Sequence, residues 1–215
     1  MNQAFIFDMD GTLIDSERTW QLLEKPMLER VLGKDTVLRL GSTVGLNASQ
    51  IFERVQKIDP SASFEDIMEG YAGIDLLAVY ESSQITSGAD ELISSLDSKG
   101  YKIGLVTQSS QFCVELVLKR LSHAAKIAQT LSLFRHPRLM PKPSPDGYIE
   151  ILRAFNAEPK RSFILEDSNA GIQSGKSAGA FVIGFRGNLL DGYQQTGADA
   201  YVDAMQQVTE IIQNR

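Results

Sequence analysis

The sequence is poor in the residues that form disulfides and zinc sites. It holds one cysteine, Cys113, and two histidines, His123 and His136, among 215 residues. One cysteine excludes an intrachain disulfide framework and a thiolate metal cluster, and the two histidines lack the spacing of a zinc site. Cys113 lies within a helical pattern, so we expect it to fill space in the core.

Long apolar runs and runs of Lys or Arg are missing as well. The apolar stretches are far too short to cross a bilayer, and the first residues do not combine a basic segment with an apolar run. The formal net charge is -6 at pH 7, which argues against a nucleic-acid surface. We expect a cytoplasmic protein that binds neither membrane nor nucleic acid, and no protein partner can be inferred.

The sequence does contain an alternation of apolar runs and helical patterns. Hydrophobic residues make up 43% of the chain, which is enough for a sizeable core. Strands buried on both faces are expected at "AFIF", "KIGLV", "SFIL" and "AFVIGF", with helical segments between the later ones. The predicted fold class is therefore α/β, with a Rossmann-like parallel-sheet core and helices on both faces.

The first two strands are separated by a long helical block. Helical periodicity is visible over residues 16–32, 47–58 and 63–80, with no comparable strand. Pro26 should kink or divide the first segment, and Ser63 with Asp66 should cap the third. The block is too large for a simple crossover. It predicts an inserted all-helical cap at 15–83, a core at 1–14 and 84–215, and hinges near 13–16 and 82–88.

The first strand runs into two aspartates, Asp8 and Asp10, which are separated by one methionine and followed by Gly11. Residues i and i+2 of a strand share a face, so the two carboxylates should point the same way. Their repulsion must be offset by a divalent cation or a shared proton. The alternative is that Asp10 and Gly11 only form a turn.

Polar residues follow two later strands in the same manner. "KIGLV" runs into Thr107, Gln108 and two serines, and "FIL" runs into Glu166 and Asp167. Ligands of open α/β sheets bind at the carboxyl ends of the strands, so these groups should meet at one rim. Lys142 precedes a predicted helix and should join them. Taken singly, the serines could be helix N-caps, and Lys142 and the acid pair could be solvated loop residues.

Together these groups fit phosphoryl transfer. Asp8 would attack phosphorus, and Asp10 would protonate the leaving oxygen and then deprotonate water. A cation such as Mg²⁺ would bind Asp8 and Asp167, while Lys142 and Thr107 would hold the phosphoryl oxygens. Gly11 would let the chain turn away beneath the phosphate.

Four segments in this order resemble the motifs of the haloacid dehalogenase superfamily. They are "FDMDGTLIDS", "VTQSS", "PKPSPDGY" and "ILEDSNAGIQSGKSAGA", and the helical block resembles the superfamily's α-helical cap. The resemblance implies that Asp8 is the nucleophile and Asp10 the acid/base. It implies that Mg²⁺ is bound by Asp8, Asp167 and the Asp10 carbonyl, with support from Glu166, and that Thr107 and Lys142 hold the phosphate.

The chain departs from the family pattern at two places. Gln108 stands where the family more often has Asn or Ala, and we expect it to contact substrate or phosphate. The segment before Lys142 lacks the usual Phe-Asp and glycine landmarks, so the loop that carries Arg135, His136 and Arg138 is hard to place.

Three functions compete, and a dehalogenase is disfavoured because Asp10 is present. The leading one is a Mg²⁺-dependent phosphatase of a small phosphorylated metabolite, since "DSERTW" resembles the start of the cap in phosphatases of sugar and sugar-alcohol phosphates. A β-phosphoglucomutase-like phosphotransferase and a non-catalytic binding protein are the alternatives. Specificity should lie on the cap, at Trp20, Gly45, Leu46 and Asn47, and Trp20 either packs on the substrate or fills the cap core.

Overall fold

A six-stranded sheet forms the centre of the computed structural model, which describes residues 2–214. All its pairings are parallel, in the order β5-β4-β1-β6-β7-β8. The strands are β1 (Ala4–Phe7), β4 (Lys102–Thr107), β5 (Ile127–Ser132), β6 (Phe163–Glu166), β7 (Phe181–Phe185) and β8 (Ala200–Val202). The predicted α/β fold class is confirmed.

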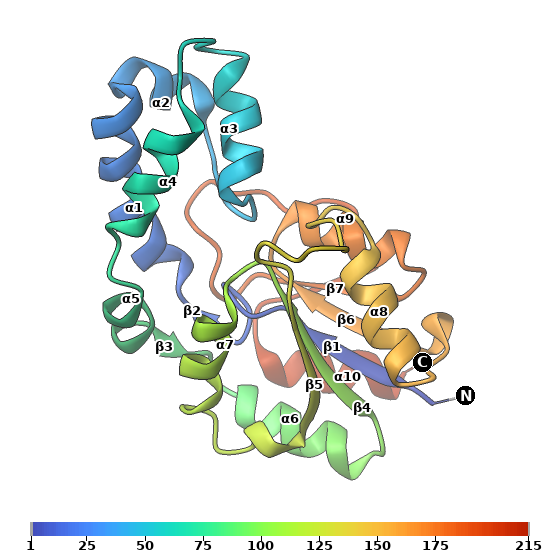
Figure 1. Cartoon of the computed structure of the whole chain (residues 1–215). Coiled ribbons are helices and arrows are strands. Elements are labelled where there is room, and N and C mark those ends of the chain that lie inside the picture. The colour runs from blue at the N-terminus through green and yellow to red at the C-terminus, as the bar shows by residue number, and fades with distance from the viewer. Residues whose placement is uncertain (1, 215) are drawn as a thin grey trace.

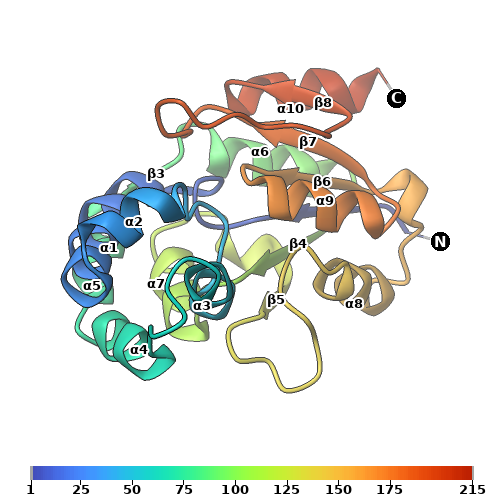
Figure 2. The ribbon, with the colours of Figure 1, turned by 90° about the horizontal axis from the view of Figure 1, so that it is seen from above.

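Helices cover both faces of this sheet (Figures 1 and 2). The side chains of β1 alternate, because Phe5 and Phe7 enter one buried cluster while Ala4 and Ile6 enter another. The first cluster includes side chains of α6 (Ala89–Ser98), α7 (Gln111–Leu118) and α10 (Met205–Gln213), and the second those of α8 (Asp146–Ala154) and α9 (Asn169–Ser177). Two 3-10 turns, Ala124–Lys126 and Pro159–Arg161, complete this part of the chain.

The sequence predicted the inner strands and missed the two at the edges. β5 exposes or half-exposes most of its residues, and β8 is three residues long. An edge strand is buried less than an inner one and can be very short, so neither carries the continuous apolar run of a buried strand.

The helical block after β1, which lies at the left of Figure 1, has a hydrophobic core of its own. Met27, Leu28, Val37, Leu40, Ile51 and Val55 are buried in one cluster that is separate from the sheet. Its helices are α1 (Glu17–Leu32), α2 (Lys34–Leu40), α3 (Ala48–Gln56), α4 (Phe64–Ala72) and α5 (Leu76–Ser82). The helical insert after the first strand is as expected for a cap, while its boundaries at 15 and 83 stay a prediction.

Two details of the insert bear on the sequence expectation. Helix α1 continues through Pro26, so the proline does not divide it, and a kink at Pro26 stays a prediction. The third helical segment breaks into α4 and α5 around Gly73, and the predicted cap at Ser63 is present, since Ser63 Oγ accepts a hydrogen bond from Asp66 N at 3.3 Å.

The two connections between insert and core run side by side. β2 (Ile14–Asp15) and β3 (Gln84–Ile85) form an antiparallel pair, in which Ile14 faces Ile85. Thr86 adds a backbone bond to Leu13 O at 2.9 Å. The segments predicted as hinges are therefore tied to one another, so a movement of the cap would involve both.

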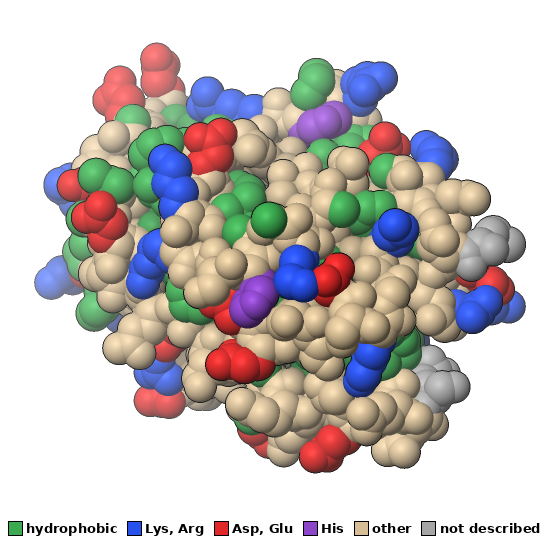
Figure 3. Space-filling view, turned by 90° about the horizontal axis from the view of Figure 1, so that it is seen from below, with side chains coloured by type: hydrophobic (Ala, Val, Ile, Leu, Met, Phe, Trp, Pro, Cys, Tyr) green, Lys and Arg blue, Asp and Glu red, His purple; other side chains and the backbone are tan. Residues whose placement is uncertain are grey.

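No helix within residues 2–214 has the length and apolarity that a membrane span requires. On the face shown in Figure 3, basic and acidic side chains are interspersed and form no continuous basic patch.

Candidate active site

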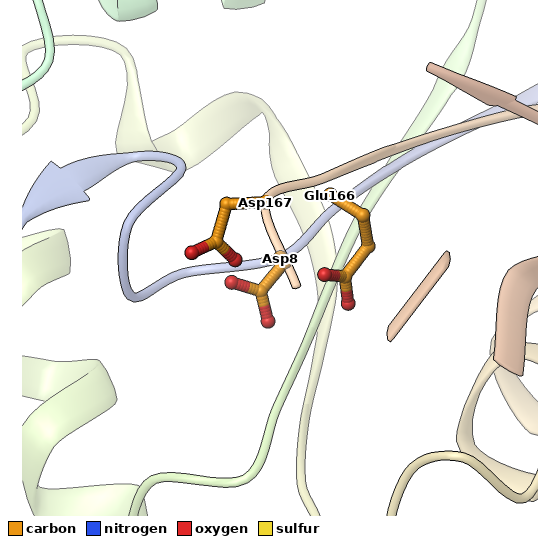
Figure 4. A group of neighbouring side chains, drawn as sticks. All are labelled: Asp8, Glu166 and Asp167. Carbon is orange, nitrogen blue, oxygen red and sulfur yellow. The ribbon is translucent and has the colours of Figure 1, made fainter. Parts of the chain in front are cut away.

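Three buried carboxylates converge where β1 and β6 end (Figure 4). Asp8 follows β1, while Glu166 is the last residue of β6 and Asp167 comes next. One carboxylate oxygen from each lies within 4.8 Å of the others, and all three side chains are buried. The parallel sheet brings them together because β1 and β6 are hydrogen-bonded neighbours.

Lys142 inserts its ammonium group between two of these carboxylates. Lys142 Nζ donates to Asp8 Oδ1, to Glu166 Oε1 at 2.7 Å and to the carbonyl of Val106 at 3.0 Å. Its side chain is 3% exposed, so it is not the solvated loop residue of the alternative interpretation. Tyr148 of α8 donates to Glu166 Oε1 at 2.7 Å. Two donors therefore hold the same oxygen of Glu166 in place.

The charge of the cluster is not balanced by Lys142 alone. Burial raises the pKa of Asp8 to about 8, with help from Glu166 and Asp10 and against the opposing effect of Lys142. Burial also raises the pKa of Asp167 well above its usual value, and the charge of Asp8 adds to the effect. Although burial disfavours the charged form of Lys142, Asp8 and Glu166 outweigh it and raise its pKa. One more cation, or protons, must neutralise the site.

These residues fit a Mg²⁺ ion. Buried carboxylate oxygens from three side chains are the hard donors that this cation prefers, and no cysteine or histidine among the described residues joins them. Gly11 keeps the space beside Asp167 open, because a Cβ on Gly11 would lie 2.1 Å from Asp167 Oδ2. Gly11 also has φ +75°, which a residue with a side chain rarely adopts. The glycine is thus required by the site and not only by the turn.

Asp10 faces a set of hydroxyl groups instead. Its Oδ1 accepts hydrogen bonds from Ser16 Oγ at 2.7 Å and Tyr80 OH at 2.8 Å. Its Oδ2 accepts from Ser109 Oγ at 2.6 Å and more weakly from Thr107 Oγ1 at 3.4 Å. The two aspartates of the first motif therefore have different surroundings: Asp8 is paired with an ammonium group, and Asp10 with neutral donors.

A cavity of about 1180 Å³ opens from these residues toward the cap. The predicted cap residues line it, namely Trp20, Gly45, Leu46 and Asn47. Trp20 also packs edge-on against Tyr80, with ring centroids 6.4 Å apart, and against the hydrophobic cluster at the sheet. It does not join the buried cluster of the cap, as one alternative expected, and its contact with substrate stays a prediction.

Two glutamates of α1, Glu17 and Glu24, line the same cavity. Burial, with the charges of Asp10 and Glu24, raises the pKa of Glu17 to about 8. Glu24 accepts hydrogen bonds from Tyr71 OH at 2.5 Å and from Thr43 Oγ1. The cap side of the cavity is thus acidic around α1.

Gln108 lies beside the site, but its side chain is directed to the cap. Its Nε2 donates to Gly45 O at 2.7 Å, and its Oε1 accepts from Asn47 Nδ2 at 3.2 Å. A role in phosphate binding stays a prediction for Gln108, as it does for Thr107, whose buried side chain points to Asp10.

The loop that the sequence left unplaced reaches the cavity with two of its residues. Phe134 and Arg135 line the cavity, and the Arg135 guanidinium lies 5.4 Å from the Phe134 ring centre. His136 Nδ1 accepts backbone hydrogen bonds from Arg138 at 3.3 Å and Leu139 at 3.1 Å. Those contacts give His136 a part in shaping the loop.

Sequence reasoning missed several hydroxyl groups of the site. Tyr80 and Tyr148 lie inside helical patterns, where an aromatic residue is expected in the core. The sequence assigns Ser16 no role in the site, although the first motif includes it. Either serine after Gln108 can be expected as a helix N-cap or as a contact of the site; Ser110 is the cap of α7, and Ser109 binds Asp10.

The chain matches the model of the haloacid dehalogenase-like hydrolases over residues 5–185, and it belongs to this family. It is 28% identical to hexitol phosphatase B of Escherichia coli, over 81% of this chain and 79% of the relative. It is 26% identical to the mitochondrial (DL)-glycerol-3-phosphatase 1 of Arabidopsis thaliana, over 86% of this chain but only 64% of the relative's length.

Solved structures show the same fold. A hydrolase from Pseudomonas syringae superposes with a TM-score of 0.80 at 19% identity, covering 100% of this chain and 99% of the other. A putative β-phosphoglucomutase from Thermotoga maritima gives a TM-score of 0.69 at 22% identity, covering 98% and 99%. At these identities the likeness concerns the fold alone.

Proposed function

We propose that this member of the haloacid dehalogenase-like hydrolase family is a Mg²⁺-dependent phosphomonoesterase, acting on a sugar or sugar-alcohol phosphate through an aspartyl phosphate on Asp8. The observation that carries the proposal is the pairing of Asp8 with Lys142 inside the cluster of Glu166 and Asp167. A carboxylate held beside a buried ammonium group can attack an anionic phosphoryl group whose charge is neutralised on arrival.

Lys142 orients the nucleophile. It binds Asp8 Oδ1, while Asp8 Oδ2 accepts no hydrogen bond from the described residues. Oδ2 attacks phosphorus as the bond from phosphorus to the leaving oxygen breaks, and Lys142 together with the Thr107 hydroxyl holds phosphoryl oxygens. Bound Mg²⁺, held by Asp8, Asp167 and the Asp10 carbonyl with support from Glu166, would neutralise negative charge on the phosphoryl group.

Asp10 moves the proton in both halves of the reaction. It gives a proton to the leaving alkoxide and later takes one from the water that attacks the aspartyl phosphate, which frees inorganic phosphate and restores Asp8. Ser16, Tyr80 and Ser109 hold its carboxylate in place between the two steps.

The cap residues near the reacting groups support a substrate with a single phosphate. Trp20 and Ala48 offer no positive charge to hold a second phosphate, and the carboxyl groups of Glu17 and Glu24 line the same cavity. Hydroxyl groups of a polyol or sugar suit such carboxylates as hydrogen-bond donors. The names of the relatives from Escherichia coli and Arabidopsis thaliana, phosphatases of hexitol and glycerol phosphates, agree with this class.

A turnover screen tests the proposal. Phosphate release is measured with Mg²⁺ on phosphorylated hexitols, glycerol 3-phosphate, hexose phosphates, nucleotides and glycolytic acids, beside Asp8→Asn as the inactive control. Release from polyol or sugar phosphates above the others is expected. Absence of turnover throughout would favour a non-catalytic binding protein.

A second assay separates hydrolysis from phosphoryl transfer. β-Glucose 1-phosphate with a trace of glucose 1,6-bisphosphate is followed by phosphorus NMR. Free phosphate should accumulate, and glucose 6-phosphate formed faster than free phosphate would instead identify a mutase.

A further inference from the structure

Three amide side chains join the cap loop before α3 to the core. Gln108 lies on the core, and Asn47 and Gln50 lie at the start of the cap helix α3. Gln108 binds Gly45 O and Asn47 Nδ2, while Gln50 Nε2 donates to the carbonyl of Lys142. All three are half-buried, and both polar ends of Gln108 are used on the cap.

The backbone partners fix how each amide is oriented. Asn47 Oδ1 accepts from Gln50 N at 3.0 Å, and Gln50 Oε1 accepts from Asn47 N at 2.9 Å, which forms a complete capping box. Since backbone N–H groups only donate, the NH₂ groups of Asn47 and Gln50 must face the core. In the same way, the Gly45 carbonyl only accepts, so Gln108 presents its NH₂ there.

An acid at position 47 or 50 would cap α3 equally well, because Asp is as good an N-cap as Asn and Glu completes a capping box as Gln does. An acid could not donate across the gap between cap and core. The choice of amides is therefore explained by that second hydrogen bond and not by the helix start.

The loop held in this way lies against the reacting groups. Gly45 has φ +72°, and a Cβ there would lie 2.6 Å from the Cβ of Ser168. Ser168 donates through its backbone N and Oγ to Glu166 Oε2 at 3.2 and 3.1 Å. Gln50 meanwhile binds the backbone of Lys142 itself. The loop and the start of α3 therefore contact the charged cluster at two points: Gln50 binds Lys142 directly, and Gly45 lies against Ser168, which binds Glu166.

We propose that Gln108, Asn47 and Gln50 form an amide latch, which holds the cap closed over the active site. Gln108 then acts as a positioning residue whose partner is the cap loop, rather than as a contact of the phosphate. The effect of the latch on turnover rests on the proposed function, since closure of the cap would exclude water from the aspartyl phosphate. The existence of the latch does not rest on the proposed function.

The experiment measures the distance between cap and core without using activity. Spin labels are attached at Leu38→Cys on the cap and Arg153→Cys on the core, which are exposed, while native Cys113 is 2% exposed. Distances are recorded with Mg²⁺, with and without inorganic phosphate, in the labelled protein and in Gln108→Glu, Gln50→Glu and Asn47→Asp. Gln111→Glu, an exposed position at the start of α7, is the charge control.

Each latch variant replaces a donor by an acceptor that faces a carbonyl or another amide oxygen. We expect the ratio of the population at the closed distance to the population at the open distance to fall roughly fivefold or more in each variant. Circular dichroism should stay unchanged, and Gln111→Glu should have no effect. Because Asn47→Asp keeps the helix cap, it stays informative if another variant folds poorly.

Unchanged distances in all three variants would overturn the latch. Weaker binding of inorganic phosphate by Gln108→Glu at an unchanged distance would also overturn it, because it would identify Gln108 as a phosphate contact. Either result can occur whether or not the protein proves to be a phosphatase.

Discussion

The core wall and the cap wall of the site are built from different polar groups. On the core, Asp8, Lys142, Glu166 and Asp167 are ionisable and buried. Across the cavity, the cap carries the carboxyl groups of Glu17 and Glu24, and its loop before α3 meets the core through neutral, half-buried amides. A buried ion pair is costly to break, whereas a half-buried hydrogen bond of an amide side chain can be replaced by a hydrogen bond to water. The difference suits a fixed reacting centre beneath a cap that opens.

Removal of Lys142 should give the largest effect on the core wall. Lys142→Met leaves Asp8 and Glu166 buried without their cation, so we expect a loss of about 3–5 kcal/mol in the free energy of unfolding and loss of turnover. Chemical denaturation with and without Mg²⁺ measures the first. A variant as stable as the parent in EDTA would show that the ammonium group does not balance the cluster.

Asp10→Asn should leave the charged cluster intact and stop the proton transfers. Turnover should fall by roughly 10²–10⁴-fold, while Mg²⁺ affinity, measured by calorimetry, changes little because only the Asp10 carbonyl is assigned to the metal. Loss of Mg²⁺ binding equal to that in Asp8→Asn would instead make the Asp10 side chain a ligand.

The metal-free cluster should respond to pH. The pKa of Asp8 is about 8 in the folded chain, against an ordinary value of 3.8, so between these values the folded state binds a proton that the unfolded state lacks. Stability in EDTA must therefore fall as pH rises from 5 to 8, and each kcal/mol lost lowers Tm by about 2–4 °C in a chain of this size.

Addition of Mg²⁺ should raise Tm more at pH 8 than at pH 5, since the ion replaces the proton. Asp8→Asn provides the control, with a flatter dependence on pH in EDTA. A Tm in EDTA that rises from pH 5 to pH 8 would contradict the charge imbalance.

Tyr80→Phe should have the smallest effect on turnover, because it removes only one of the hydroxyl groups that bind Asp10. It removes one donor at 2.8 Å and leaves those of Ser16 and Ser109. We expect a loss of about 0.5–1.5 kcal/mol in transition-state stabilisation, seen in kcat more than in KM. A change confined to KM would mean that Tyr80 contacts substrate.

The core wall could be predicted from the sequence far better than the cap wall. Asp8, Thr107 and Glu166 lie at the ends of apolar strands, which can be recognised in the sequence. Because the carboxyl ends of parallel strands lie at the same edge of a sheet, these residues could be predicted to lie close together. Lys142 could be predicted only with the order of the four motifs, because nothing in a Pro-Lys-Pro segment indicates burial between two carboxylates.

The remaining residues depend on packing that no local pattern encodes. Tyr80 reaches Asp10 only because α5 lies beside α7, and Tyr148 reaches Glu166 from the buried face of α8. Both look like ordinary core residues of amphipathic helices. The orientation of Gln108 likewise depends on where the cap loop lies, which the sequence does not specify.

The nucleophilic role of Asp8 is tested most directly by trapping the aspartyl phosphate. The enzyme is mixed with Mg²⁺ and the best substrate of the screen, quenched within one turnover and reduced with borohydride, which converts an aspartyl phosphate to homoserine. Mass spectrometry of the tryptic peptide 1–18, which ends at Arg18, should then find homoserine at position 8. Release of phosphate with Asp8 unmodified, or with the modification at another carboxylate, would contradict the account.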